Sequence, residues 1–161
     1  MVDRTGTPLV ELRDISISFG GIKAVDHVTV DLFPGEVVGL LGHNGAGKST
    51  LIKCLSGAYQ KDAGQILING QEVEIKDPRD AIRRGIGMVH QHFQLVPVMT
   101  VAENMMLGHE PTKAGGRLDI ASAREMVRTL SAKHGLPVDP DTEIEDLPVG
   151  TQQRVEILKA L

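Results

Sequence analysis

The sequence predicts an α/β fold in which a glycine-rich loop joins a buried strand to a helix. The loop occupies residues 42–50 and reads GHNGAGKST. A short apolar run at 37–41 precedes the loop, as expected for a buried strand. Apolar residues recur at helical spacing from Leu51 to Ala58 after it, and Gly57 lies where that helix would end.

Two antiparallel hairpins are predicted from the alternation of apolar and polar residues. Their strands are expected at 15–19 with 28–32 and at 65–68 with 71–75. Gly20-Gly21 interrupts the alternation of the first pair. Asn69-Gly70 separates the second pair, and this dipeptide is typical of two-residue hairpin turns.

A short helix and a further strand are expected after the second hairpin. Asp77-Pro78 supplies an N-cap and a first helical residue, and Gly85 closes the helix. The apolar run at 86–89 is then predicted to be a strand, with His90-Gln91-His92 at its carboxyl end. Ligands bind at this end of strands in open α/β sheets.

The second half of the chain is predicted to be helical. Thr100–Glu103 reads as a capping box, with Gly108 as the expected end of that helix. Apolar residues at 120–130 mark one face of a longer helix that ends at Gly135. The final segment, 151–161, is strongly helical and has no terminating residue, so we expect the element to continue in an intact protein.

The loop at 42–50 fits the phosphate-binding pattern G-x-x-x-x-G-K-S/T, although the pattern alone also allows an ordinary glycine-rich turn. Glycines let several backbone N–H groups converge on a phosphate chain, and a helix N-terminus favours its charge. Lys48 can reach the β and γ oxygens, and the Ser49 hydroxyl can bind Mg²⁺. The candidate nucleotide-binding residues are Gly42, His43, Asn44, Gly45, Ala46, Gly47, Lys48, Ser49 and Thr50.

Composition narrows the function classes. The chain has 161 residues, which suits one domain with a substantial core. A net charge of −4 and an aromatic content of 2% argue against a nucleic-acid partner. No apolar run has membrane-spanning length and no signal peptide is evident, so a cytoplasmic protein is expected. Cys54 is predicted to be a small buried apolar residue rather than a reactive thiol.

Four segments in this order resemble the ATP-binding cassette of ABC transporters over residues 9–161. These are the segment around Phe19, the loop 42–50 (the family's Walker A motif), the segment around Gln91, and residues 147–154. The resemblance implies an α/β P-loop NTPase fold with an N-terminal antiparallel β subdomain and an inserted helical subdomain. Its expected parts are a tail at 1–8, a β and P-loop core at 9–97 and a helical subdomain at 98–161.

The resemblance also implies residue roles. Phe19 matches the aromatic residue that stacks on adenine, although a plain core position on a strand is the alternative. The other aromatic residues are Phe33, Tyr59 and Phe93. Gln91 matches the glutamine that contacts Mg²⁺ and the attacking water. Lys48 and Gln91 are thus the catalytic candidates, and Ser49 and Gln91 the metal ligands.

His90 and His92 are not favoured as a separate metal site. Residues one apart on a strand end point to opposite faces, so the two imidazoles would diverge.

Residues 147–154 align with the family's signature sequence L-S-G-G-Q-Q-Q-R. Gly150, Gln152, Gln153 and Arg154 agree with it, and Gly150 is the candidate nucleotide contact from this segment. Pro148 replaces the serine whose hydroxyl reaches the nucleotide held by the opposite cassette. Proline has neither a hydroxyl nor a backbone N–H to donate.

The sequences of three segments, 90–93, 100–104 and 152–161, are most similar to those of importers of simple sugars and nucleosides. The resemblance then implies MgATP as cofactor, with membrane permease subunits, a second cassette and, indirectly, a solute-binding protein as partners. The protein would lie on the cytoplasmic side of the membrane. The family's hydrolytic acidic residues and switch histidine follow the signature helix, so we expect these 161 residues alone to be a weak ATPase.

Three other functions differ from an importer in the residues that they require. A GTPase would need an N-K-x-D motif, which this sequence lacks. A soluble ABC ATPase without a transport role shares the cassette, and a module that binds nucleotide without hydrolysing it fits the residues present.

Overall fold

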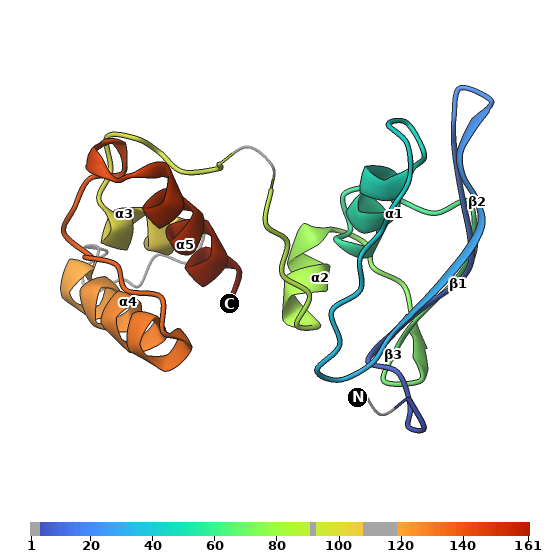
Figure 1. Ribbon diagram of the computed structural model, residues 1–161, viewed down its shortest axis with the longest axis horizontal. Coiled ribbons are helices and arrows are strands. Elements are labelled where there is room, and N and C mark those ends of the chain that lie inside the picture. Colours follow the sequence, from blue (N-terminus) through green and yellow to red (C-terminus); the bar gives the residue numbers. More distant parts are fainter. Residues whose placement is uncertain (1–3, 91–92, 108–118) are drawn as a thin grey trace. The chain divides into compact units, whose positions relative to one another are not determined.

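The computed structural model describes residues 4–90, 93–107 and 119–161. The chain divides into two compact units, Met1–Gly87 and Met88–Leu161 (Figure 1). Within the described ranges, none of the helices combines the length and the apolar character needed to cross a membrane.

The first unit contains one four-stranded antiparallel sheet with strand order β2-β1-β3-β4. Its strands are β1 (Val10–Phe19), β2 (Ile22–Leu32), β3 (Ala63–Ile68) and β4 (Gln71–Val73). Both predicted hairpins are therefore confirmed, and the strands of the first are longer than predicted. Asn69 and Gly70 have φ angles of 51° and 76°, as a two-residue turn with positive φ requires.

Two helices lie on the same side of this sheet, α1 (Lys48–Leu55) and α2 (Pro78–Arg83) (Figure 1). The core between them and the sheet consists of Leu12, Ile15, Ile17, Val25, Leu51, Cys54, Ile66, Ile75 and Ala81. Ile15 and Ile17 are two residues apart on β1, and Leu51 and Cys54 are three apart on α1, so each pair lies on one face of its element.

The register between β1 and β2 is irregular in three places, between Leu12 and Ile15, between Ile15 and Ile17, and between Ile17 and Ser18. Asp14 and His27 lie at the first two of these irregularities, and their φ angles are positive, 55° and 51°. The Asp14 Oδ1 and His27 Nδ1 atoms lie 2.8 Å apart. Asp14 N–H donates to Thr29 Oγ1 and His27 N–H to Ser16 Oγ, so side chains replace the ladder bonds lost at these two irregularities.

The strands predicted at 37–41 and 86–89 are not formed. Neither segment pairs with another strand among the described residues. Val37 is 98% exposed and Leu41 96% exposed. The prediction from apolar runs is therefore wrong for these segments, because a strand requires a hydrogen-bonded neighbour as well as an apolar sequence.

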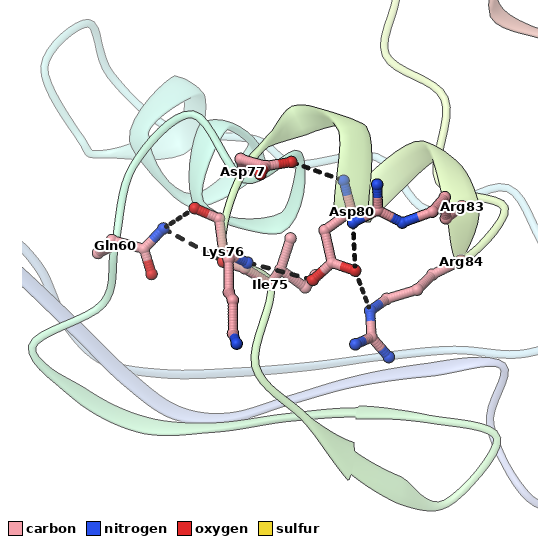
Figure 2. Close-up of polar contacts among 7 residues, drawn as sticks. All are labelled: Gln60, Ile75, Lys76, Asp77, Asp80, Arg83 and Arg84. Atoms are coloured by element: carbon pink, nitrogen blue, oxygen red, sulfur yellow. Dashed lines mark hydrogen bonds and ion pairs between the residues drawn. The ribbon is translucent and has the colours of Figure 1, made fainter.

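Helix α2 begins as predicted, with Pro78 after the Asp77 N-cap, whose Oδ1 accepts a hydrogen bond of 2.8 Å from Asp80 N–H. The Asp80 carboxylate in turn accepts bonds of 3.3 Å from Lys76 N–H, from Arg83 and from Arg84 (Figure 2). The Lys76 hydrogen bond and the two guanidinium groups hold the pKa of Asp80 below its ordinary value. This carboxylate therefore fastens the helix to the segment that leads into it.

The second unit is helical, as predicted. Its elements are α3 (Val101–Met106), α4 (Ile120–His134), the 3₁₀ turn η1 (Ile144–Asp146) and α5 (Val149–Ala160). The capping box is confirmed: Glu103 N–H donates to Thr100 Oγ1 over 3.3 Å, and Glu103 Oε2 accepts from Thr100 N–H over 2.8 Å. The hydrogen bonds that the Thr100 N–H and hydroxyl donate to the Glu103 carboxylate lower the pKa of Glu103.

The end of α4 is confirmed as well, since Gly135 caps it with a φ of 65°. The end predicted for α3, Gly108, lies outside the described residues. The core of the second unit consists of Val101, Ala102, Met106, Ala123, Val127, Ile144 and Val155.

Asn104 is fully buried in this apolar core, and its amide holds the segment that leads into α3. Its Oδ1 accepts from Val96 N–H over 2.7 Å. Its Nδ2 lies 3.1 to 3.2 Å from the carbonyl oxygens of Val96, Met99 and Thr100. Every polar atom of the side chain thus has a hydrogen-bond partner, and these bonds offset the cost of burying an amide in an apolar core.

Replacing Asn104 by alanine is expected to lower the free energy of unfolding of this unit by about 2 kcal/mol, because buried backbone groups lose their partners. Urea unfolding followed by circular dichroism measures this loss. Thr129→Ala, at an exposed position of α4, is the control and should change stability by no more than about 0.5 kcal/mol. Equal stability of the two variants would contradict the role given to the amide.

Candidate nucleotide-binding site

The phosphate-binding loop predicted at 42–50 forms an open turn that leads into α1. Ala46 N–H donates to His43 O over 3.2 Å, and the helix begins at Lys48 after Gly47. Residues 42–46 and Ser49 are exposed. The first N–H groups of α1 have no carbonyl partner within the helix, so they remain available to an anion at this exposed end.

Lys48 folds back over this loop. Its Nζ donates to Gly42 O over 2.6 Å and to His43 O over 2.8 Å. Among the described residues no carboxylate pairs with Lys48, so its positive charge is not neutralised by an acidic side chain. The loop therefore combines an ammonium group with free N–H donors, and this donor set fits a triphosphate chain.

Gly47 fixes the position of the loop against the sheet. Its φ is 78°, in the left-handed region, and a Cβ at this position would overlap the carbonyl oxygen of Ala24 in β2. The same Cβ would lie 3.1 Å from Val25 Cγ2. Only glycine allows both the conformation and the close approach here. The sequence pattern required this glycine, but Ala24 as its neighbour was not predicted.

The predicted base-stacking residue, Phe19, ends β1 beside the turn at Gly20-Gly21. Its side chain is 47% exposed, so it is not a core residue. Its ring contacts the ring of Tyr59 edge to face, with centroids 5.2 Å apart and planes at 68°. Phe19 belongs to the same compact unit as the phosphate-binding loop.

Comparison with known proteins decides the family. The family described as "ABC transporter" matches residues 25–161, which is most of the chain. The chain belongs to the ABC transporter family. Its fold is accordingly that of a P-loop ATP-binding cassette, as the sequence resemblance implied.

Curated relatives of this ABC chain are import ATP-binding proteins. A ribose import ATP-binding protein of Rubrobacter xylanophilus is 49% identical over 154 residues, 96% of this chain and 31% of its own length. A guanosine import ATP-binding protein of Bacillus subtilis is 47% identical over 153 residues, 95% of this chain and 30% of its own. The chain thus spans about a third of the length of these relatives.

Solved ABC cassettes have the same fold. A nucleotide-free ATP-binding cassette from an ABC transporter superposes with a TM-score of 0.76 at 26% identity. The ADP conformation of an ATP-binding cassette gives 0.77 at 27% identity. Each alignment covers 95% of this chain and 64% of the solved chain.

Two of the predicted ABC site residues, Gln91 and Gly150, are distant in sequence from the loop at 42–50. Gln91 and the neighbouring His92 lie outside the described residues. Gly150 lies in the first turn of α5, in the second unit. Pro148 is the N-cap of that helix and provides no side-chain hydrogen bond to it, whereas its carbonyl accepts from Thr151 N–H over 2.8 Å. Helix α5 therefore begins without a side-chain cap.

Cys54 lies on the inner face of α1 and is 2% exposed, which confirms the prediction of a buried apolar role. Burial raises the pKa of its thiol above the ordinary value. A reactive thiol is thus not part of this ABC site.

Proposed function

We propose that this chain is the ATP-binding part of an ABC importer that takes up a simple sugar or a nucleoside. The observation that carries the proposal is the loop at 42–50, with Lys48 over its carbonyls and a free helix N-terminus at its end. The relatives named above support the import role, since they are described as ribose and guanosine import ATP-binding proteins.

Most of the proposed contacts with the nucleotide come from residues of the first unit, each binding a different part of it. The N–H groups of residues 42–50 and the Lys48 ammonium would hold the phosphates, and Phe19 would stack on adenine. The Ser49 hydroxyl would contribute to a Mg²⁺ shell, together with Gln91. Bound Mg²⁺ would neutralise charge on the β and γ phosphates.

Gln91 and Gly150 would each have a separate role in the ATPase reaction. A neutral amide such as that of Gln91 suits the orientation of water, because it donates and accepts without taking the proton. Gly150, in the signature segment, would contact the nucleotide that is held by the opposite cassette. Hydrolysis would require, in addition, a group that activates the attacking water.

The partners follow from the import role. Membrane permease subunits would receive the free energy of ATP hydrolysis, and a second cassette would complete the ATPase. A solute-binding protein would deliver the solute to the permease. The ATP-binding subunit would lie at the cytoplasmic surface of the membrane without spanning it.

Uptake by a strain without the gene tests this proposal. We expect uptake of one labelled pentose, hexose or nucleoside at micromolar concentration to fall to background, and a plasmid copy of the intact gene to restore it. Unchanged uptake of all these solutes, accompanied by a defect in translation or chromosome maintenance, would favour a soluble ABC ATPase and contradict the importer.

A further inference from the structure

The Phe19 ring has one aromatic neighbour among the described residues, Tyr59. Tyr59 follows α1 in the chain, and its ring meets that of Phe19 edge to face at 5.2 Å. Edge-to-face pairs are a preferred arrangement of aromatic rings. Because Phe19 keeps about half of its surface exposed, it can contact Tyr59 and still offer surface to a ligand.

Tyr59 is itself fixed to the helix that begins at the phosphate-binding loop. The N–H groups of Ala58 and Tyr59 both donate to Lys53 O, over 2.8 and 3.1 Å. The Lys53 ammonium lies 5.3 Å from the centroid of the Tyr59 ring, within cation–π range. One short helix therefore carries Lys48 in its first turn and orients Tyr59 from its last.

The segment that follows Tyr59 is held by hydrogen bonds to two other parts of the first unit, residues 75–76 and the end of β1. The Gln60 side chain donates to the carbonyl oxygens of Ile75 and Lys76, over 3.2 and 3.1 Å (Figure 2). Asp62 forms two hydrogen bonds with the end of β1.

Asp62 N–H donates to Ser16 O over 2.9 Å, and Asp62 Oδ2 accepts from Ser18 N–H over 2.7 Å. Ser18 directly precedes Phe19. The backbone on which the Phe19 side chain stands is thus tied to the same segment that carries Tyr59.

We propose that Tyr59 is a positioning residue for the nucleotide base: it holds the Phe19 ring in the orientation that accepts adenine. The inference rests on the proposed role of Phe19 in stacking. A half-exposed phenylalanine at a strand end would otherwise sample several rotamers, and ordering it on binding would reduce affinity. No hydrogen bond of the Tyr59 hydroxyl is found within the described residues, so the ring and not the hydroxyl performs this role.

The test compares a ligand that has a base with one that lacks it. Calorimetry on the full-length protein measures the dissociation constants of MgATP and of magnesium tripolyphosphate. Tyr59→Leu is expected to weaken MgATP binding about three- to tenfold, the range of one aromatic pair. Binding of tripolyphosphate should change by less than about twofold, since its site is the loop at 42–50.

Two further variants separate positioning from general damage. Tyr59→Phe keeps the ring and should bind MgATP as the unchanged protein does. Phe19→Leu should weaken MgATP selectively, and adding Tyr59→Leu to it should cause no further loss, because the two rings act as a unit.

The outcomes distinguish the inference from the function on which it rests. If Phe19→Leu leaves MgATP binding unchanged, the stacking role is wrong and the inference falls with it. If Phe19→Leu weakens MgATP but Tyr59→Leu does not, stacking stands and the inference is overturned. If Tyr59→Leu weakens both ligands equally, Tyr59 supports the helix rather than the base, and the inference is again overturned.

Discussion

Replacing Lys48 by alanine is expected to reduce solute uptake to background and to weaken MgATP binding about 10- to 100-fold. The range corresponds to the loss of a charge-assisted interaction with phosphate. The Lys48 ammonium now bonds to Gly42 O and His43 O and faces no carboxylate among the described residues. Removing the Lys48 ammonium therefore takes a positive charge away from the phosphate site and breaks no ion pair of the described residues.

Uptake of the labelled solute by cells that carry the intact gene measures the first effect, and calorimetry the second. Lys133→Ala provides a control with the same loss of charge, because Lys133 is exposed in the last turn of α4. It should leave both quantities unchanged. Normal uptake by the Lys48 variant would refute the proposal that ATP drives this import.

Gly47→Ala is expected to have the second large effect, on folding as well as on binding. The left-handed φ of 78° and the overlap of a Cβ with Ala24 O both oppose a side chain. Together they should lower the free energy of unfolding of the first unit by about 2 to 4 kcal/mol. Binding of magnesium tripolyphosphate should be lost at the same time, since the loop must move away from β2.

Two other glycines separate the causes of this loss. Gly45 has a φ of 85° but open space around it, so Gly45→Ala should cost only about 1 to 2 kcal/mol for the backbone conformation. Gly39 has open space and no left-handed φ, so Gly39→Ala should change stability by no more than about 0.5 kcal/mol. Urea unfolding that gives equal losses for Gly47 and Gly45 would show that the contact with Ala24 does not matter.

Local chemistry explains what could be predicted from the sequence. The turn at 42–50 that leads into α1, the Asn69-Gly70 turn and the cap at Thr100–Glu103 all depend on neighbours within a few residues. The required residue types are therefore visible in a short window. The exposed ring of Phe19 at the end of β1 was reached through the family resemblance, and its role at the base remains a prediction.

The features that could not be predicted from the sequence depend on contacts between distant segments. The run at 37–41 has the composition of a buried strand, yet strand formation depends on a partner that the run itself does not encode. Ala24 opposite Gly47 and Tyr59 beside Phe19 are likewise contacts across the fold. Asn104 left one usable signal, a lone amide on the apolar side of a short helix, but its carbonyl partners became known only from the structure.

Cys54 gives the first unit a reporter of its own opening. It is the one cysteine of the chain, and it lies between α1 and the sheet with a raised pKa. Thiolate, the form that reacts with alkylating reagents, is therefore scarce until α1 separates from the strands. The rate of Cys54 alkylation therefore reports how often α1 separates from the strands. A ligand bound at the other end of the same helix would slow this alkylation, so mass spectrometry of alkylated Cys54 would report nucleotide occupancy.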